Sequence, residues 1–184
     1  LCYFLLLGAT YVMVFWLPTL IKSWGVTDVF LVGVYAAIPN AVGVVGMILV
    51  GRSSDKMNER RWHFAGSCLL AAVMLYVTSL FQGNLALSLV ALSIAVIGIA
   101  SATPVFFAQL SEYLPPSAAA GGIALVSSLG NLGPSITPSV NAWLLQRTGD
   151  NIYSLYFVMA LYTCSGLLLL AITQAAPVSR AACS

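Results

Sequence analysis

Hydrogen-bonding side chains occur at helical spacing inside an otherwise apolar part of this chain. Asn131 follows Ser127 by four residues and Ser128 by three, so all three share a face if the segment is helical. Neither amide nor hydroxyl is ionised near neutral pH, and no histidine or lysine lies nearby to act as a base. The chemistry available to these side chains is therefore hydrogen bonding, either to a polar solute or to another helix.

Other polar residues stand alone in apolar segments, and they are Tyr11, Asn40, Ser101 and Thr103. An amide without a partner in hydrocarbon costs several kcal/mol, so such groups should face protein or water rather than lipid. Two interpretations stay open, which are contacts to a solute and hydrogen bonds between helices. The glycines around Asn131 favour a solute path there, whereas the hydroxyls of Ser101 and Thr103 can also bond to their own helix.

The elements that position these residues are predicted to be membrane-spanning helices. Hydrophobic residues make up 60% of the chain and charged residues 7%, against about 25% charged residues in soluble domains. A spanning helix needs about 20 residues, so 184 residues hold six spans, at about 2–21, 29–50, 64–81, 85–110, 118–145 and 152–173. We expect an all-α, polytopic six-helix bundle that forms one domain over residues 1–184.

Half of the twelve charged residues fall between Arg52 and Arg61. This run predicts a charged cytoplasmic loop at 51–63, between the second and third spans. With six spans, the basic residues of this loop and Arg180 share one side, whereas only Lys22 and Arg147 lie on the other. Because basic residues are retained in the cytoplasm, both termini are expected to be cytoplasmic.

The two halves of the chain resemble each other weakly, because the second and fifth spans are both rich in glycine. Two three-helix units of opposite orientation are typical of transporters with inverted repeats, although glycines also serve ordinary close packing of membrane helices. Since Leu1 is not an initiator methionine and a span begins at once, we expect a fragment of a longer protein.

The segment from Gly51 to Arg61 resembles the cytoplasmic signature G-x-x-x-D-R-x-x-R-R of the major facilitator superfamily, with Lys56 in place of the usual arginine. The strings at 15–19, 121–125 and 128–133 are similar to the C-terminal half of its anion:cation symporter branch, although Phe106-Phe107 stands where a pair containing tryptophan is more usual. The resemblance implies helices seven to twelve of a twelve-helix transporter in the bacterial inner membrane, partnered by an N-terminal six-helix half. It also implies proton-coupled transport of an organic anion, such as a sugar acid, tartrate or an aromatic carboxylate, by alternating access.

In that family the first, second, fourth and fifth helices of each half line the cavity. The resemblance thus makes Asn131 and Tyr11 the first choices for substrate contacts. The further expected contacts are Asn40, Ser127, Ser128 and Thr103, and the expected gating latch comprises Gly51, Arg52, Asp55, Lys56, Arg60 and Arg61. No charged residue lies deep in a span, so the cation that anchors the anion and the acid that carries the proton are expected in the N-terminal half.

Other functions are less well matched by the sequence. A nutrient sensor or a channel-like protein on the same fold is the alternative interpretation. An intramembrane enzyme is not expected, because the one histidine, His63, lies at a membrane edge and no Asp or Glu is central. The four cysteines are too far apart for a zinc or redox motif, and a net charge of +2 does not favour nucleic acid. No cofactor is expected.

Overall fold

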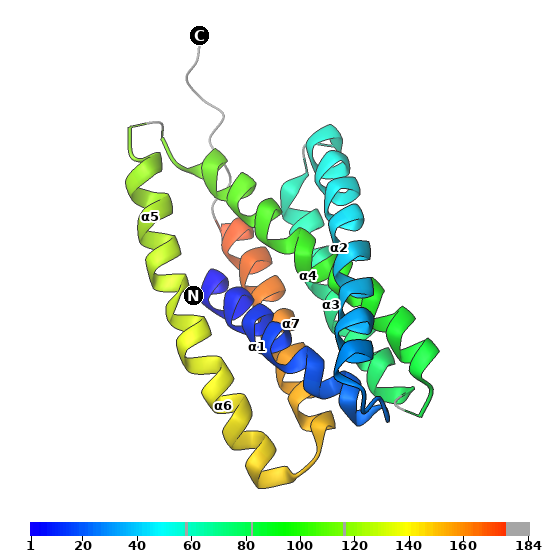
Figure 1. The fold of residues 1–184 in the computed structure, drawn as a ribbon. Coiled ribbons are helices and arrows are strands. Elements are labelled where there is room, and N and C mark those ends of the chain that lie inside the picture. The colour runs from blue at the N-terminus through cyan, green and yellow to red at the C-terminus, as the bar shows by residue number, and fades with distance from the viewer. Residues whose placement is uncertain (58, 82, 116, 176–184) are drawn as a thin grey trace.

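The computed structural model describes residues 1–57, 59–81, 83–115 and 117–175. Within these ranges the chain forms seven α-helices and no strand (Figure 1). The helices are α1 (Cys2–Ser23), α2 (Val29–Met57), α3 (Arg60–Leu80), α4 (Leu85–Tyr113), α5 (Ala119–Gly130), α6 (Leu132–Thr148) and α7 (Asn151–Ala175). The all-α class predicted from the sequence is confirmed.

Five of these helices, α1, α2, α3, α4 and α7, are long and apolar enough to cross a membrane. The sixth predicted span, 118–145, is divided into α5 and α6, which lie end to end in Figure 1. The predicted span 118–145 is therefore not one helix, because Pro134 has no N–H to donate to the carbonyl of Gly130. The chain nevertheless keeps its direction, since Asn131 N–H donates to the carbonyl oxygen of Ser127 at 3.0 Å.

The charged run is mostly helical, so the predicted loop at 51–63 is also wrong. α2 continues to Met57 and α3 begins at Arg60; residue 58 lies outside the described residues. Residues 52–57 contain no proline or glycine, and a helix that leaves the hydrocarbon can carry charged side chains into water without losing its backbone hydrogen bonds. The helical spans therefore extend beyond the membrane on this side.

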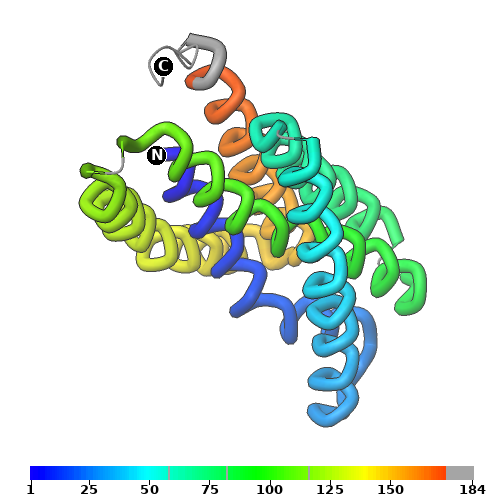
Figure 2. The backbone as a smooth tube through the Cα atoms, turned by 90° about the horizontal axis from the view of Figure 1, so that it is seen from above, coloured from blue at the N-terminus to red at the C-terminus, as the bar shows by residue number. Residues whose placement is uncertain are grey.

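The helices pack in a pattern that repeats between the two halves of the chain. α4 packs against α2 and α3, while α1 packs against α6 and α7, and α3 and α7 lie together on one side of the bundle (Figure 2). If α1 is exchanged with α4, α2 with the α5–α6 span, and α3 with α7, the same pairs of helices remain in contact. It is the arrangement that a 3+3 repeat requires.

Glycines allow the helices to approach closely at these contacts. A Cβ atom on Gly133 of α6 would collide with the carbonyl oxygen of Phe4 in α1, and one on Gly43 of α2 would lie 2.7 Å from Cγ1 of Val96 in α4. Between membrane helices, van der Waals contact replaces the hydrophobic effect as the main attraction. Small residues at the contacts are thus what lets this bundle form.

Hydrogen bonds between helices supplement this packing around α1. The hydroxyl of Thr137 in α6 donates to the carbonyl oxygen of Gly8 at 2.9 Å. On the opposite side, the hydroxyls of Thr10 and Tyr162 in α7 lie 2.9 Å apart. Such bonds contribute about 0.6 kcal/mol each on average in membrane proteins, so they fix the register of the helices more than they add to stability.

We predict that Gly98→Ala destabilises the protein. The added Cβ would meet the backbone of α3 at the carbonyl oxygen of Ser67 and, at 2.9 Å, the nitrogen of Ala71, and overpacking of this kind costs about 1–3 kcal/mol. Gly33→Ala is the matched control, because nothing lies within 4 Å of its Cβ position. Thermal unfolding in detergent should show a lower Tm for Gly98→Ala only; equal Tm values for the two variants would contradict close packing of α3 on α4.

Candidate functional site

The span formed by α5 and α6 has three different faces. The buried face packs on α1 through Gly130, Gly133 and Thr137. A second face is exposed and carries large apolar side chains, namely Leu125, Leu129, Leu132, Ile136, Val140 and Trp143. A third face is exposed and polar, with Ser128, Asn131, Ser135, Ser139 and Gln146. Lipid suits the second face, whereas the third requires water or protein.

Asn131 lies on this polar face, at the junction of α5 and α6. Its side-chain Nδ2 donates to the carbonyl oxygen of Ser127 at 2.8 Å, which leaves the second N–H and Oδ1 available. Ser127 is half-buried and Ser128 is exposed. The helix itself thus holds the amide in a fixed orientation, from which it can donate one hydrogen bond and accept others.

Asn40 has the equivalent arrangement on α2. Its Nδ2 donates to the carbonyl oxygen of Ala36 at 2.8 Å, and it is exposed directly after a buried residue, Pro39, just as Asn131 follows buried Gly130. α2 and the α5–α6 span occupy corresponding places in the packing of the two repeats, so the two asparagines lie on corresponding spans. Each repeat therefore presents one oriented amide on its second span.

Tyr11 is exposed although most of α1 is buried. α1 leaves one exposed stripe, which contains Tyr11, Val14, Phe15, Pro18, Thr19 and Lys22. The rings of Tyr11 and Phe15 lie 5.9 Å apart. α6 and α7 pack against other sides of α1, so this stripe is left uncovered by the described residues.

The two polar residues predicted on α4 differ in exposure. Ser101 is fully buried, and its hydroxyl donates to the carbonyl oxygen of Ile97 at 2.6 Å, so the packing interpretation applies to it. Thr103 is half-buried. Within the described residues, Tyr11, Asn40, Thr103 and Asn131 share no hydrogen bond with one another, and their convergence on one solute stays a prediction.

The charged run forms an ion-pair cluster that joins three helices. Arg60, at the start of α3, places Nη2 at 3.4 Å from Oδ1 of Asp55 in α2 and Nε at 3.1 Å from Oε1 of Glu112 in α4. The Nε–H is not aligned as a hydrogen bond to the carboxylate. The Arg60 side chain is 22% exposed, against 70% for Asp55 and 49% for Glu112, so the arginine is the centre of the cluster.

The remaining latch residues surround this cluster without joining it. Arg52 and Lys56 are exposed and form no ion pair within the part of the chain that the structure describes. Gly51 is half-buried, with no atom within 4 Å of its Cβ position. The guanidinium of Arg61 lies 5.3 Å from the ring centre of Trp62, an arrangement typical of a cation–π contact at a membrane interface.

His63 connects the ends of α2 and α3. Its Nδ1 lies 2.8 Å from the carbonyl oxygen of Glu59, and a carbonyl only accepts, so Nδ1 carries the proton. In the neutral ring, Nε2 then accepts from the hydroxyl of Ser53, at 3.2 Å. This histidine therefore has structural partners at the membrane edge, as expected for an interfacial residue.

Sequence reasoning missed Glu112 as a member of the cluster. It treated this residue only as the end of the fourth span, although the alternating direction of the spans puts it on the same side as the charged run. An acidic residue isolated at a helix end, on the side where arginines accumulate, is the signal that could have identified it.

Comparison with known proteins identifies the family. Residues 1–138 match the sequence model of the Major Facilitator Superfamily. The chain belongs to this superfamily. Helices α2 and α3 accordingly carry its charged signature, and the bundle corresponds to a six-helix half of the superfamily fold.

Several curated relatives are similar to most of the chain. A protein of Agrobacterium vitis named "Putative tartrate transporter" is 38% identical over 181 residues, which cover 96% of this chain and 40% of that protein. The metabolite transport protein NicT of Pseudomonas putida is 36% identical over 83% of the chain and 35% of its own length. The 4-hydroxybenzoate transporter PcaK of Acinetobacter baylyi is 30% identical over 78% of the chain and 31% of its own length. The chain thus spans between 31% and 40% of the length of these relatives.

We predict that Glu112→Gln changes stability little, because partly exposed ion pairs contribute about 0–1 kcal/mol each. The Tm in detergent should fall by a few degrees at most, and Arg60→Gln, which removes both pairs, should lower it more than Glu112→Gln does. Lys56→Gln is the control, because it removes a charge outside the cluster. A larger effect of Lys56→Gln than of Arg60→Gln would contradict the cluster.

Proposed function

We propose that the complete protein is a secondary active transporter of a small organic anion and that this chain forms one of its two six-helix halves. The observation that carries the proposal is the exposed polar face of the α5–α6 span, which includes Asn131 and is separate from the apolar face that suits lipid. The names of the relatives support the substrate class, since they include a tartrate and a 4-hydroxybenzoate transporter.

The hydrogen-bonding groups on this face fit the oxygen-rich end of such an anion. The amides of Asn131 and Asn40 and the hydroxyl of Tyr11 would donate to carboxylate or hydroxyl oxygens. Within the described residues, however, every charged side chain lies near a helix end. A buried anion needs a cation, and proton coupling needs a titrating acid, so we assign both groups to the other six-helix half.

In this proposal the Arg60 cluster acts as the cytoplasmic latch of alternating access. The protein would lie in the inner membrane of a bacterium with both termini in the cytoplasm, because the four basic residues of the charged run lie at one end of the bundle and only Lys22 and Arg147 lie at the other. Arg180, which also entered the predicted charge bias, lies outside the described residues.

Uptake into proteoliposomes tests the proposal directly. The full-length protein should give saturable uptake of labelled tartrate, a sugar acid or 4-hydroxybenzoate, accelerated by an inward proton gradient. Preloading with unlabelled substrate should accelerate exchange, because a carrier shows counterflow. Flux without counterflow would indicate a channel, and binding without uptake would indicate a sensor.

We predict that Asn131→Ala lowers uptake at subsaturating substrate by about tenfold or more, because a hydrogen bond to a charged partner contributes about 1.5–3 kcal/mol. Ile136→Ala is the matched control on the lipid-facing side of the same span and should retain uptake. Initial rates, normalised to reconstituted protein, measure both effects. Equal uptake by the two variants would remove Asn131 from the substrate path.

We also predict that Asp55→Asn changes transport kinetics while leaving the Tm nearly unchanged. Asp55 is the most exposed member of the cluster, so its contribution to stability is small. Its ion pair with Arg60 nevertheless connects α2 to α3 in the proposed latch. Initial uptake and counterflow rates should therefore shift relative to the wild type. Wild-type kinetics at normal expression would rule out the latch.

A further inference from the structure

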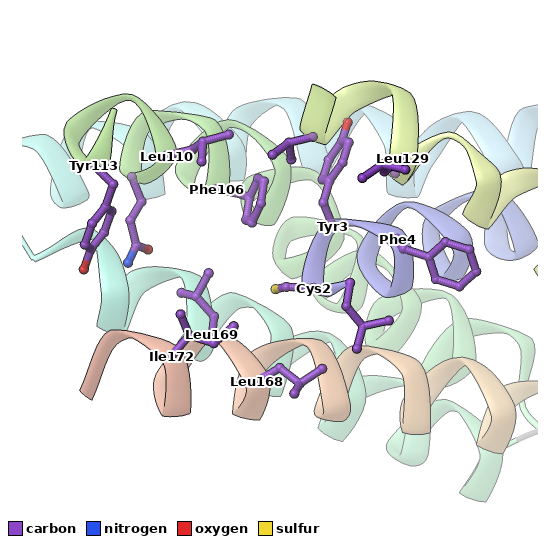
Figure 3. A pocket seen from close by; sticks show the side chains of 14 residues that line it. Cys2, Tyr3, Phe4, Phe106, Leu110, Tyr113, Leu129, Leu168, Leu169 and Ile172 are labelled. Atoms are coloured by element: carbon purple, nitrogen blue, oxygen red, sulfur yellow. The ribbon is translucent and has the colours of Figure 1, made fainter. Parts of the chain in front are cut away.

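An apolar pocket lies outside the polar faces described above. Its volume is about 440 Å³, and it lies between the start of α1, the last turns of α4, α5 and the end of α7 (Figure 3). Neither the predicted substrate residues nor the members of the Arg60 cluster line it. Its size falls within the range of about 300–1,000 Å³ typical of small-molecule sites.

Aromatic rings form one wall of this pocket. The rings of Tyr3 and Phe106 are stacked, with centroids 5.1 Å apart and an interplanar angle of 12°. Phe107 lies edge-on to Tyr3, at 4.9 Å. Figure 3 shows Phe106 on α4 and Tyr3 on α1, with Leu169 and Ile172 approaching from α7. Offset or edge-on stacking against such a wall favours a flat, ring-containing molecule.

One buried polar group in the wall lacks a partner. Gln109 lies three residues after Phe106 on α4 and is only 5% exposed, and its Oε1 accepts no hydrogen bond from the described part of the chain. An unsatisfied buried acceptor costs about 1–3 kcal/mol. A ligand that donates one hydrogen bond to this oxygen would remove that cost.

We propose that this pocket binds an uncharged aromatic molecule that carries one hydroxyl donor, with the ring against Tyr3 and Phe106 and the hydroxyl on Gln109 Oε1. No charged side chain among the described residues lines the pocket, so an ionised ligand would be buried without compensation. The ligand therefore differs in charge from the anion that the proposed transport requires. The inference does not depend on transport.

Direct binding to the full-length protein in lipid nanodiscs tests this site. The probe is tritiated 2-naphthol, with empty nanodiscs as the background and unlabelled naphthalene as the competitor that has the ring system but no donor. Gln109→Leu removes the acceptor at similar volume, and Val126→Phe fills the pocket while keeping the acceptor. N-Ethylmaleimide modification then locates the site, because Cys2 lines this pocket, whereas Cys164 is exposed and does not line it.

We expect saturable binding of 2-naphthol to the wild type, with about a tenfold advantage over naphthalene. Gln109→Leu should abolish this advantage, Val126→Phe should abolish binding, and bound 2-naphthol should slow modification of Cys2 but not of Cys164. Binding no greater than to empty nanodiscs would overturn the proposal. So would an equal affinity for naphthalene, which would indicate an acyl chain or other purely apolar occupant, or an advantage that persists in Gln109→Leu.

Discussion

Close backbone contact at glycines is the constraint on which this bundle depends. Lipid tails are as apolar as leucine, so helices in a membrane gain little from burying leucine against one another. Gly133 brings α6 against the backbone of α1, Gly98 brings α4 against α3, and Gly43 brings α2 against α4. The two central helices, α1 and α4, are thereby held among their neighbours by van der Waals contact.

These contacts determine which side chains remain outside the bundle. On the α5–α6 span, the glycine face is fixed against α1, so the polar and apolar stripes are both left exposed but point in different directions. Lipid can cover only one of them at low cost. The polar stripe must therefore meet water or protein, which is how packing between helices constrains where a solute can pass.

The sequence was sufficient for the parts of the fold that depend on composition and helical period. The apolar stretches located the helices, whereas the expectation that Asn40 and Asn131 contact a solute stays a prediction. The sequence was insufficient where a structural feature depends on which residues, distant in the chain, meet in space. Both the helical state of residues 52–57 and the pairing of Arg60 with Glu112, which is 52 positions away in the chain, depend on how the ends of α2, α3 and α4 meet. The unpartnered oxygen of Gln109 likewise follows from packing, because nothing in its neighbouring residues marks it.

The length of α2 and α4 places the charged cluster far from the middle of these helices. Each has 29 residues, so at about 1.5 Å per residue each is about 44 Å long, whereas the hydrocarbon layer is about 30 Å thick. A tilt of about ten degrees around the middle of such a rod displaces its tip by about 4 Å. Arg60 joins the tips of both helices through its two ion pairs, so these pairs lie where a given tilt produces the largest displacement.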